Sequence, residues 1–167
     1  MNSHPSIPFI RPAKPGDEKG IHEAHMRSIR EICVKDHGKE EIRGWGNRPL
    51  GDRWITQIQE GFVWVVENHG AIQGFSYIRI FENQGEMKAF IHGLYLTPEV
   101  LKFGFGAKLM KLMLDKAQEA GVKEVTLTST ITAHDFYRRM GFVDSGEKTC
   151  REIGGSPVTC FPMIRKL

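Results

Sequence analysis

The stretch Leu101-Lys102-Phe103-Gly104-Phe105-Gly106-Ala107 decides how this chain folds. It lies between an apolar segment at residues 91–96 and a long run, residues 105–119, whose apolar residues recur at helical spacing. This pattern predicts a strand, a turn and a helix in that order. Two closely spaced glycines at the start of a helix leave backbone N–H groups uncovered, and such groups bind anions. The stretch therefore predicts a site for a phosphate-bearing ligand.

The residues after the glycines exclude two familiar phosphate-binding turns. The loop of nucleoside triphosphatases needs Lys and then Ser or Thr after its last glycine, whereas Gly106 is followed by Ala107, Lys108 and Leu109. The dinucleotide fingerprint needs a third small residue where this chain has Leu109. The alternative to a ligand site is a turn that uses the backbone freedom of glycine and binds nothing.

At this point the chain resembles the GNAT superfamily of acyl-CoA-dependent N-acyltransferases. The central motif of that family reads Arg/Gln-x-x-Gly-x-Gly/Ala, and residues 101–106 match it at both glycines, with Leu101 in place of Arg or Gln. A second family stretch is similar to Ala133-x-x-Phe136-Tyr137-x-x-x-Gly141-Phe142, with Thr130 where Asn or Ser is usual. The resemblance runs from about residue 10 to the end of the chain.

The resemblance implies that acetyl-CoA is the acyl-donor co-substrate and that no metal takes part. In the family, the glycine loop holds the CoA pyrophosphate mainly through main-chain N–H groups, and the preceding strand supplies N–H groups to the thioester carbonyl. The residues expected to contact the cofactor are Leu94, Tyr95, Leu96, Leu101, Lys102, Phe103, Gly104, Phe105, Gly106, Ala107 and Thr130. A helix cap is the alternative role for Thr130.

Attack of an amine on a thioester requires a neutral amine and a proton for the departing thiolate. Tyr137 matches the family position near the CoA sulfur, so the resemblance implies that it is the general acid; its alternative is a core tyrosine bonded to backbone. His92 lies on the strand that the family aligns with the acyl group, which makes it a candidate base. Its alternative is a purely structural histidine. Phe90 stands where many relatives carry an acid, and His25 is a further candidate base.

The acceptor pocket is expected in the first helices and the loop between them, which vary most within the family. Ser28 and Trp45 are the candidate substrate-binding residues, and core packing is the alternative for Trp45. The acceptor is predicted only as a primary amine, because nothing in the sequence selects among a small molecule, a peptide and a protein.

Composition limits the class of protein. The 167 residues are 40% hydrophobic and 26% charged, which is ordinary for one globular domain spanning residues 1–167. A net charge of +3 without a basic run does not indicate a nucleic-acid partner. Three cysteines without metal or redox spacing favour a reducing compartment. With neither a membrane-length apolar segment nor a secretory signal, the expected location is the cytoplasm.

The resemblance also implies the fold class, which is α+β: the GNAT fold, with a mixed, mostly antiparallel central sheet of about six to seven strands flanked by about four helices. Local patterns agree with that order, with separate helices beginning near residue 15 and near residue 40 and two closing strands near 142–149 and 158–164. Many GNAT proteins form dimers, and a homodimer is a hypothesis that no residue here decides.

The leading functional hypothesis is an N-acetyltransferase that moves the acetyl group of acetyl-CoA to a primary amine by direct attack in a ternary complex. Neither motif contains a cysteine, which argues against a covalent acyl-enzyme. The alternatives are a non-catalytic acyl-CoA-binding or regulatory module and, third, an interaction domain that has lost the cofactor.

Overall fold

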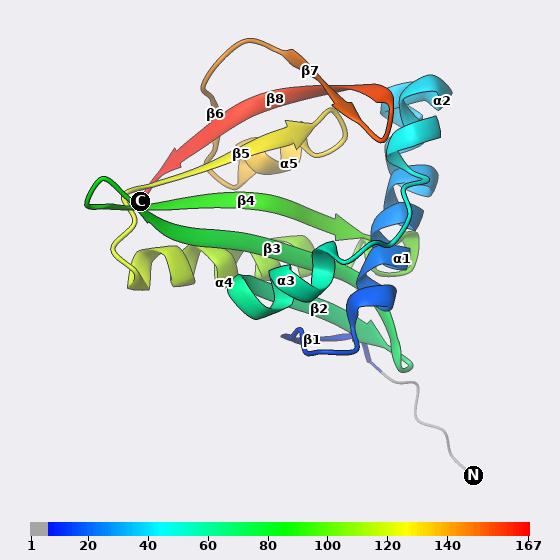
Figure 1. Ribbon diagram of the computed structural model, residues 1–167, viewed down its shortest axis with the longest axis horizontal. Helices are drawn as coiled ribbons and strands as arrows, with labels where there is room; N and C mark the ends of the chain where they lie inside the picture. The colour runs from blue at the N-terminus through cyan, green and yellow to red at the C-terminus, as the bar shows by residue number, and fades with distance from the viewer. Residues whose placement is uncertain (1–6) are drawn as a thin grey trace.

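The computed structural model describes residues 7–167, and its centre is an eight-stranded sheet. The strand order is β1-β2-β3-β4-β5-β8-β6, with β7 paired to β8 outside this path (Figure 1). Every strand pair is antiparallel except β4–β5, which is parallel. The α+β GNAT-type fold expected from the sequence is confirmed. The strand count is higher than predicted because the closing segment forms three strands instead of two.

The strands are β1 (Phe9–Pro12), β2 (Phe62–Asn68), β3 (Ala71–Asn83), β4 (Glu86–Leu96), β5 (Glu124–Thr130), β6 (Val143–Asp144), β7 (Thr149–Ile153) and β8 (Ser156–Lys166). The helices are α1 (Glu18–Ser28), α2 (Val34–Trp45), α3 (Arg53–Glu60), α4 (Phe105–Glu119) and α5 (His134–Arg139). A π-helical turn, η1 (Ile29–Cys33), joins α1 to α2, and a 3-10 turn, η2 (Pro98–Val100), precedes the glycine loop. The extreme N-terminus, on which the absence of a secretory signal was judged, lies outside the described residues.

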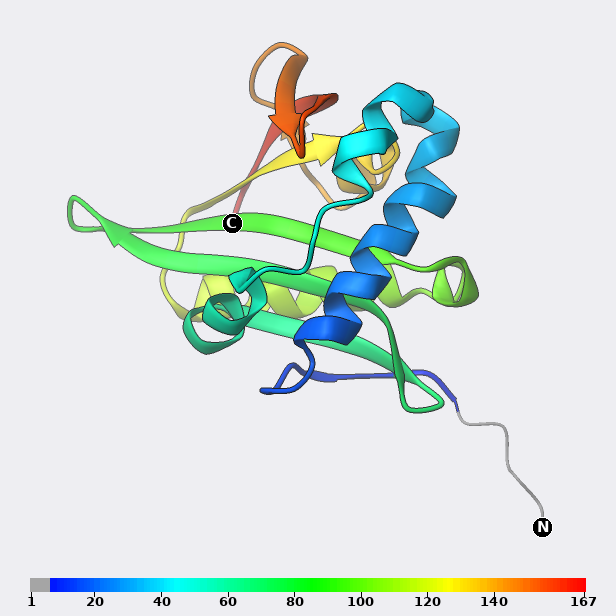
Figure 2. The same ribbon diagram turned by 45° about the vertical axis from the view of Figure 1, so that its right-hand side comes forward.

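Helices cover both faces of the sheet. Helix α4 packs on β2, β3 and β4 from one side, while α1 and α3 pack on the other side, where α1 crosses the strands obliquely (Figure 2). Strand β2 shows why: Trp64 and Val66 belong to the core on the α4 side, whereas Val63 and Val65 belong to the core under α1 and α3. Successive side chains of a strand point to opposite faces, so a continuous apolar strand needs helices on both.

The two separate first helices predicted from the sequence are present, and the break between them lies at Gly38. The chain is helical from α1 through η1 to residue 37, and a short second helix, the remainder of α2, follows Gly38, whose φ of 76° and ψ of 167° are not helical. A residue with positive φ is accommodated best by glycine. The apolar periodicity is absent between residues 34 and 41 because most of these side chains face solvent and because the helix is interrupted at Gly38.

The feature that positions the site is the short contact between β4 and β5. These parallel strands pair only through Ala89–Val125, Phe90–Thr126 and Ile91–Leu127. Beyond this junction β4 continues to Leu96 without a β5 partner, and the two strands diverge (Figure 1). The divergence opens the sheet in its middle.

None of the described helices is both long and apolar enough to cross a lipid bilayer.

Candidate active site

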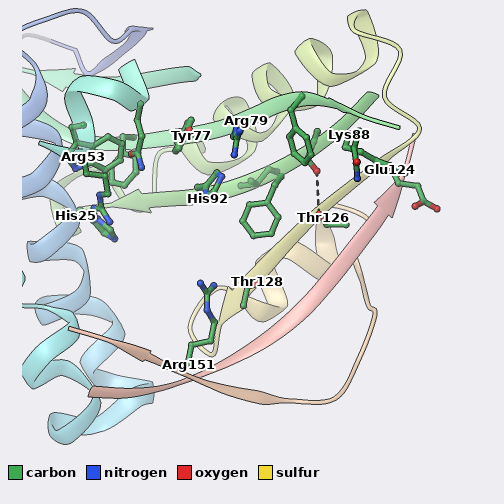
Figure 3. Close-up of a pocket in the computed structure, with 18 residues that line it drawn as sticks. His25, Arg53, Tyr77, Arg79, Lys88, His92, Glu124, Thr126, Thr128 and Arg151 are labelled. Atoms are coloured by element: carbon green, nitrogen blue, oxygen red, sulfur yellow. Dashed lines mark hydrogen bonds between the residues drawn. The ribbon is translucent and has the colours of Figure 1, made fainter. Parts of the chain in front are cut away.

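Two cavities lie where β4 and β5 separate. The first, which we call the α4-side cavity, has a volume of about 530 Å³ and is bounded by the outer part of β4, the glycine loop, the start of α4, the end of β5, and α5. The second, which we call the α3-side cavity, has a volume of about 660 Å³ and is bounded by α3, β3, β4, β5 and β7 (Figure 3). Ile91, His92 and Thr128 line both cavities, so the two cavities meet at the strand junction.

The glycine loop opens into the α4-side cavity. Gly104 is the N-cap of α4 and has φ 77° and ψ 10°, a left-handed conformation that favours glycine. Gly106 has a different requirement, because a Cβ there would lie 3.2 Å from the ring of Phe136. The N–H of Lys108 is bonded to the carbonyl of Gly104 (3.3 Å), whereas the described part of the chain supplies no acceptor for the three preceding N–H groups. These groups fit a phosphate.

Most of the residues expected to contact the cofactor line the α4-side cavity. They are Leu94, Tyr95, Leu96, Leu101, Gly104, Gly106, Ala107 and Thr130. The side chains of Lys102, Phe103 and Phe105 do not line it: Phe105 packs in the core, and Lys102 and Phe103 point to solvent. The hydroxyl of Thr130 accepts a hydrogen bond from the N–H of Ala133 (3.1 Å), which holds the turn before α5, but it does not cap the helix itself, so the capping role foreseen as its alternative is not observed.

Tyr137 lies on α5 and lines the α4-side cavity with only 5% of its surface exposed. Its ring packs against Phe136 and Phe142, with centroid distances of 5.4 and 5.8 Å. Within residues 7–167 its hydroxyl has no hydrogen-bond partner, so the alternative of a hydroxyl bonded to backbone is not observed. Burial raises the pKa of Tyr137 above its usual value, so the phenol is protonated at neutral pH.

His92 lies at a β-bulge of β4. Tyr77 pairs with Gly93 and Ile78 pairs with Ile91, which leaves His92 as the extra residue. A bulge redirects the side chain of the extra residue, and His92 here stacks on Tyr77 with a centroid distance of 4.8 Å. Desolvation, and then the nearby guanidinium groups, hold the pKa of His92 below its usual value. Its imidazole is therefore neutral at pH 7 and able to accept a proton.

Neither of the two residues expected to bind the acceptor, Ser28 and Trp45, lines the α3-side cavity. Trp45 is 2% exposed and packs with Met26, Ile29 and Ile42, and it lines neither cavity. The structure thus shows the alternative for Trp45, core packing, because the helical stretch carries its ring away from the sheet opening. Ser28 lines the α4-side cavity and not the α3-side cavity.

Sequence reasoning missed two groups of site residues. Ile32 and Cys33 reach the α4-side cavity from η1, and no periodicity in the sequence signals a π-helical turn. Arg53 and Arg151 line the α3-side cavity from α3 and β7, which are far from both motifs. Cys33 is buried, and desolvation raises the pKa of its thiol to about 11, so it is not a thiolate at neutral pH.

Comparison with known proteins agrees with this geometry. A family model described as an acetyltransferase (GNAT) domain matches residues 33–165. The chain belongs to the GNAT acetyltransferase family. As a member of this family, it is an acyl-CoA-dependent acetyltransferase.

One curated relative of this GNAT protein is the uncharacterised N-acetyltransferase YafP of Escherichia coli K12, which is 23% identical over 133 residues, covering 80% of this chain and 79% of YafP. A GCN5-related N-acetyltransferase structure from Rhodopseudomonas palustris superposes with a TM-score of 0.81 at 18% identity, and all of both chains is covered. The PaiA N-acetyltransferase of Thermoplasma acidophilum, solved in complex with coenzyme A, has a TM-score of 0.74 at 20% identity, with 96% of this chain and 99% of that chain covered. At these identities the likeness of the structures establishes the fold.

Proposed function

We propose that the protein transfers the acetyl group of acetyl-CoA directly to a primary amine, with the donor in the α4-side cavity and the acceptor in the α3-side cavity. The observation that carries this proposal is that His92 lines both cavities at the point where β4 and β5 separate. A thioester in one cavity and an amine in the other would meet beside the same imidazole. Because the two cavities meet at this opening, neither ligand would have to cross the sheet to reach the other.

The donor site is proposed from the backbone of the glycine loop and of β4. The unpaired N–H groups at residues 105–107 would bind the pyrophosphate, since the N-terminus of a helix carries a partial positive charge. The outer part of β4, residues 94–96, would hold the pantetheine and offer N–H groups to the thioester carbonyl. Preorganised donors of this kind lower an acyl-transfer barrier by about 3 kcal/mol each.

His92 is proposed as the general base. An amine with a pKa near ~10.4 must lose a proton at a cost of about 4.6 kcal/mol at pH 7 before it can attack. A neutral imidazole at the junction can take that proton as the bond forms. The ring of Phe90 lies 4.7 Å from that of His92, at the position where many relatives carry an acid. His92 thus replaces a carboxylate in this role.

Tyr137 is proposed as the general acid for the CoA thiolate. Its raised pKa makes the phenol a weaker acid than usual, but the same cavity also raises the pKa of the Cys33 thiol to about 11. A thiolate formed here is therefore also a stronger base than in water, so burial shifts the pKa of both partners in the same direction and does not make the proton transfer much less favourable than it is in water. Because Cys33 is a buried thiol, it supports direct transfer rather than an acyl-cysteine intermediate.

Three further statements belong to this proposal. We propose that residues 1–167 form one domain, since the eight strands make one sheet. We propose a cytoplasmic location, since all three cysteines are free thiols. A homodimer stays a hypothesis.

The test is a calorimetric titration of acetyl-CoA into wild type, Gly104→Asn and Gly104→Asp, followed by a free-thiol assay with a library of amines. Asn and Asp have the same shape and both tolerate the left-handed conformation, so the pair isolates the effect of a negative charge beside the pyrophosphate. We expect the Asp variant to bind acetyl-CoA at least about tenfold more weakly than the Asn variant. Equal affinities would remove the glycine loop from the site. Tight binding without turnover of any amine would favour a non-catalytic acyl-CoA-binding module instead.

A further inference from the structure

The α3-side cavity is lined by cationic side chains from four different elements: Arg53 of α3, Arg79 of β3, Lys88 of β4 and Arg151 of β7. Glu124 is the one carboxylate among the described residues that line it. Figure 3 shows Arg53 beside His25 at one end of the cavity, Arg79 near His92, and Arg151 reaching toward the same opening from β7. Cationic charge therefore surrounds the proposed acceptor path.

Most of this charge is not neutralised by the protein. Lys88 forms an ion pair with Glu86 (2.7 Å). In residues 7–167, the other three cations form no ion pair; Arg53 and Arg79 instead lie over the rings of Trp54 and Phe81, at 5.1 and 5.2 Å. A concave surface with uncompensated positive charge concentrates anions.

The end of the cavity near Arg53 also holds donors that lack an acceptor. The guanidinium of Arg53 lies 3.4 Å from Nδ1 of His25, and because arginine can only donate, this nitrogen must accept and the ring proton is on Nε2. That Nε2–H group and the indole Nε1–H of Trp54 are both buried and have no partner in the described part of the chain. His25 and Trp54 are 7% and 2% exposed, respectively.

Buried donors in native proteins are almost always hydrogen-bonded, so unpaired ones at a cavity indicate a ligand that completes them. A carboxylate or phosphate offers several acceptor lone pairs and a negative charge, which match two neutral donors and a guanidinium. The buried Oε1 of Gln57, another cavity residue without a partner in this part of the structure, supplies the complementary acceptor for an N–H or O–H of the same ligand.

We propose that the acceptor is a small amine that carries a carboxylate or phosphate in the same molecule, as an amino acid does. The anionic group binds at Arg53, His25 and Trp54, Arg79 and Arg151 flank the rest of the molecule, and the amine reaches His92. This inference rests on the proposed acetyl transfer. A cavity of about 660 Å³ has the size of small-molecule sites rather than of protein interfaces.

The same charges help the chemistry. Positive groups near the amine favour its neutral, attacking form. A polyamine, by contrast, would bring further positive charge into a cavity that repels it.

The experiment uses matched pairs of amines on the full-length protein. Each common α-amino acid is compared with its carboxamide, O-phosphoethanolamine with ethanolamine, and spermidine serves as a multiply cationic amine. Turnover is followed by the release of CoA thiol with acetyl-CoA in excess, and binding to the CoA-saturated protein is measured by calorimetry. We expect the best anionic amines to exceed their neutral partners about tenfold or more, in kcat/KM or in affinity.

Arg53→Gln tests the anion site, and Arg138→Gln is its control. Arg138 lies on α5 outside both cavities and pairs with Asp144 (2.9 Å), so its substitution removes one positive charge from the surface only. We expect Arg53→Gln to remove most of the preference for the anionic member while the Kd of acetyl-CoA stays within about twofold of wild type. Arg138→Gln should keep the full preference.

The outcomes separate the two proposals. If acetyl-CoA binds and amines are acetylated, but carboxamides or spermidine react as well as the anionic amines, the anion inference is wrong and acetyl transfer remains. If neither acetyl-CoA nor CoA binds, acetyl transfer is wrong. Each amine is then titrated into the protein alone, and equal affinities for both members of every pair overturn the anion site as well. Preference for acidic peptides over every small amine would overturn the small-molecule class.

Discussion

The imidazole Nε2 of His37 accepts a hydrogen bond of 3.0 Å from the backbone N–H of Ile131. This bond ties α2 to the loop between β5 and α5, the helix that carries Tyr137. The other ring nitrogen of His37 is bonded to Glu41, which in turn accepts hydrogen bonds from the hydroxyl and the N–H of Thr159 in β8, at 2.7 and 3.2 Å. One chain of largely buried polar groups thus connects α2, the β5–α5 loop and β8.

Removing this chain should destabilise the protein. His37→Ala leaves a buried N–H and a partly buried carboxylate without their partner, and each unsatisfied group costs about 1–3 kcal/mol. We expect the free energy of unfolding, measured with urea, to fall by at least about 2 kcal/mol. Lys39→Ala is the control, because Lys39 is exposed on the same helix. A His37 variant as stable as Lys39→Ala would show that these hydrogen bonds contribute little.

A contact between two glycines also predicts a stability effect. A Cβ at Gly44 of α2 would lie 2.0 Å from the backbone carbonyl oxygen of Gly154, so Gly44→Ala forces the β7–β8 hairpin away from α2. We expect a loss of about 2–3 kcal/mol in the free energy of unfolding. Gly20→Ala, also within a helix, is the comparison, because its Cβ meets only the side chain of Ile72 at 3.0 Å. Since alanine favours helix by about 1 kcal/mol, this second variant should stay close to wild type. Equal losses would mean that the hairpin adjusts freely.

Tyr137→Phe separates catalysis from packing. The ring stays in place, and the described structure gives the hydroxyl no hydrogen bond to lose. We expect kcat to fall by about 10²-fold or more, with the melting temperature and the Kd of acetyl-CoA unchanged. Stopped-flow thiol release and calorimetry measure the two quantities. An unaltered kcat would exclude Tyr137 as the general acid, and a lower melting temperature would point to a structural role.

The pH profile of kcat/KM tests His92 as the base. Desolvation, followed by the charges of Arg79, Arg151 and Arg53, lowers the pKa of His92 below its usual ~6.5, so the neutral form persists to lower pH. Arg151→Gln removes one of these charges and should raise the pKa of His92. The ascending limb of the pH profile of kcat/KM, which reports this pKa, should then move to higher pH. Lys111→Gln, with a side chain that is 76% exposed on α4, should leave the limb in place. The NMR signals of the His92 ring protons report the pKa of the same imidazole directly. If Arg151→Gln shifts that pKa but leaves the ascending limb of kcat/KM in place, His92 is not the base.

The sequence predicted those parts of the fold that depend on local patterns. The glycine pair at 104 and 106 predicted the turn and α4, and the apolar segment at residues 91–96 predicted the end of β4. The break between the first two helices near Gly38 agrees with the prediction, whereas the π-helical turn η1 was missed because no periodicity in the sequence signals one. The three closing strands were merged into two because β6 is only two residues long.

The candidate site was predicted unevenly for a related reason. The glycine loop and Tyr137 belong to compact motifs, so their residues are near one another in the sequence. Trp45 was misplaced because the direction of a side chain on a helix depends on how that helix packs, which the sequence does not state. Arg53 and Arg151 could not be found, because only the tertiary fold brings α3 and β7 to the same cavity.

The narrow junction between β4 and β5 has a consequence for the order of folding. The antiparallel strands β2, β3 and β4 follow one another in the chain, so their hairpins close short loops. The parallel pairing of β4 with β5 must close a loop that contains all of α4, and it is held by three residue pairs. Because long loops close at a greater entropic cost, we expect the antiparallel strands β2 to β4 to form early and the β4–β5 junction to form late. Both cavities, and with them any ligand protection against unfolding, would then arise only in the final folding step.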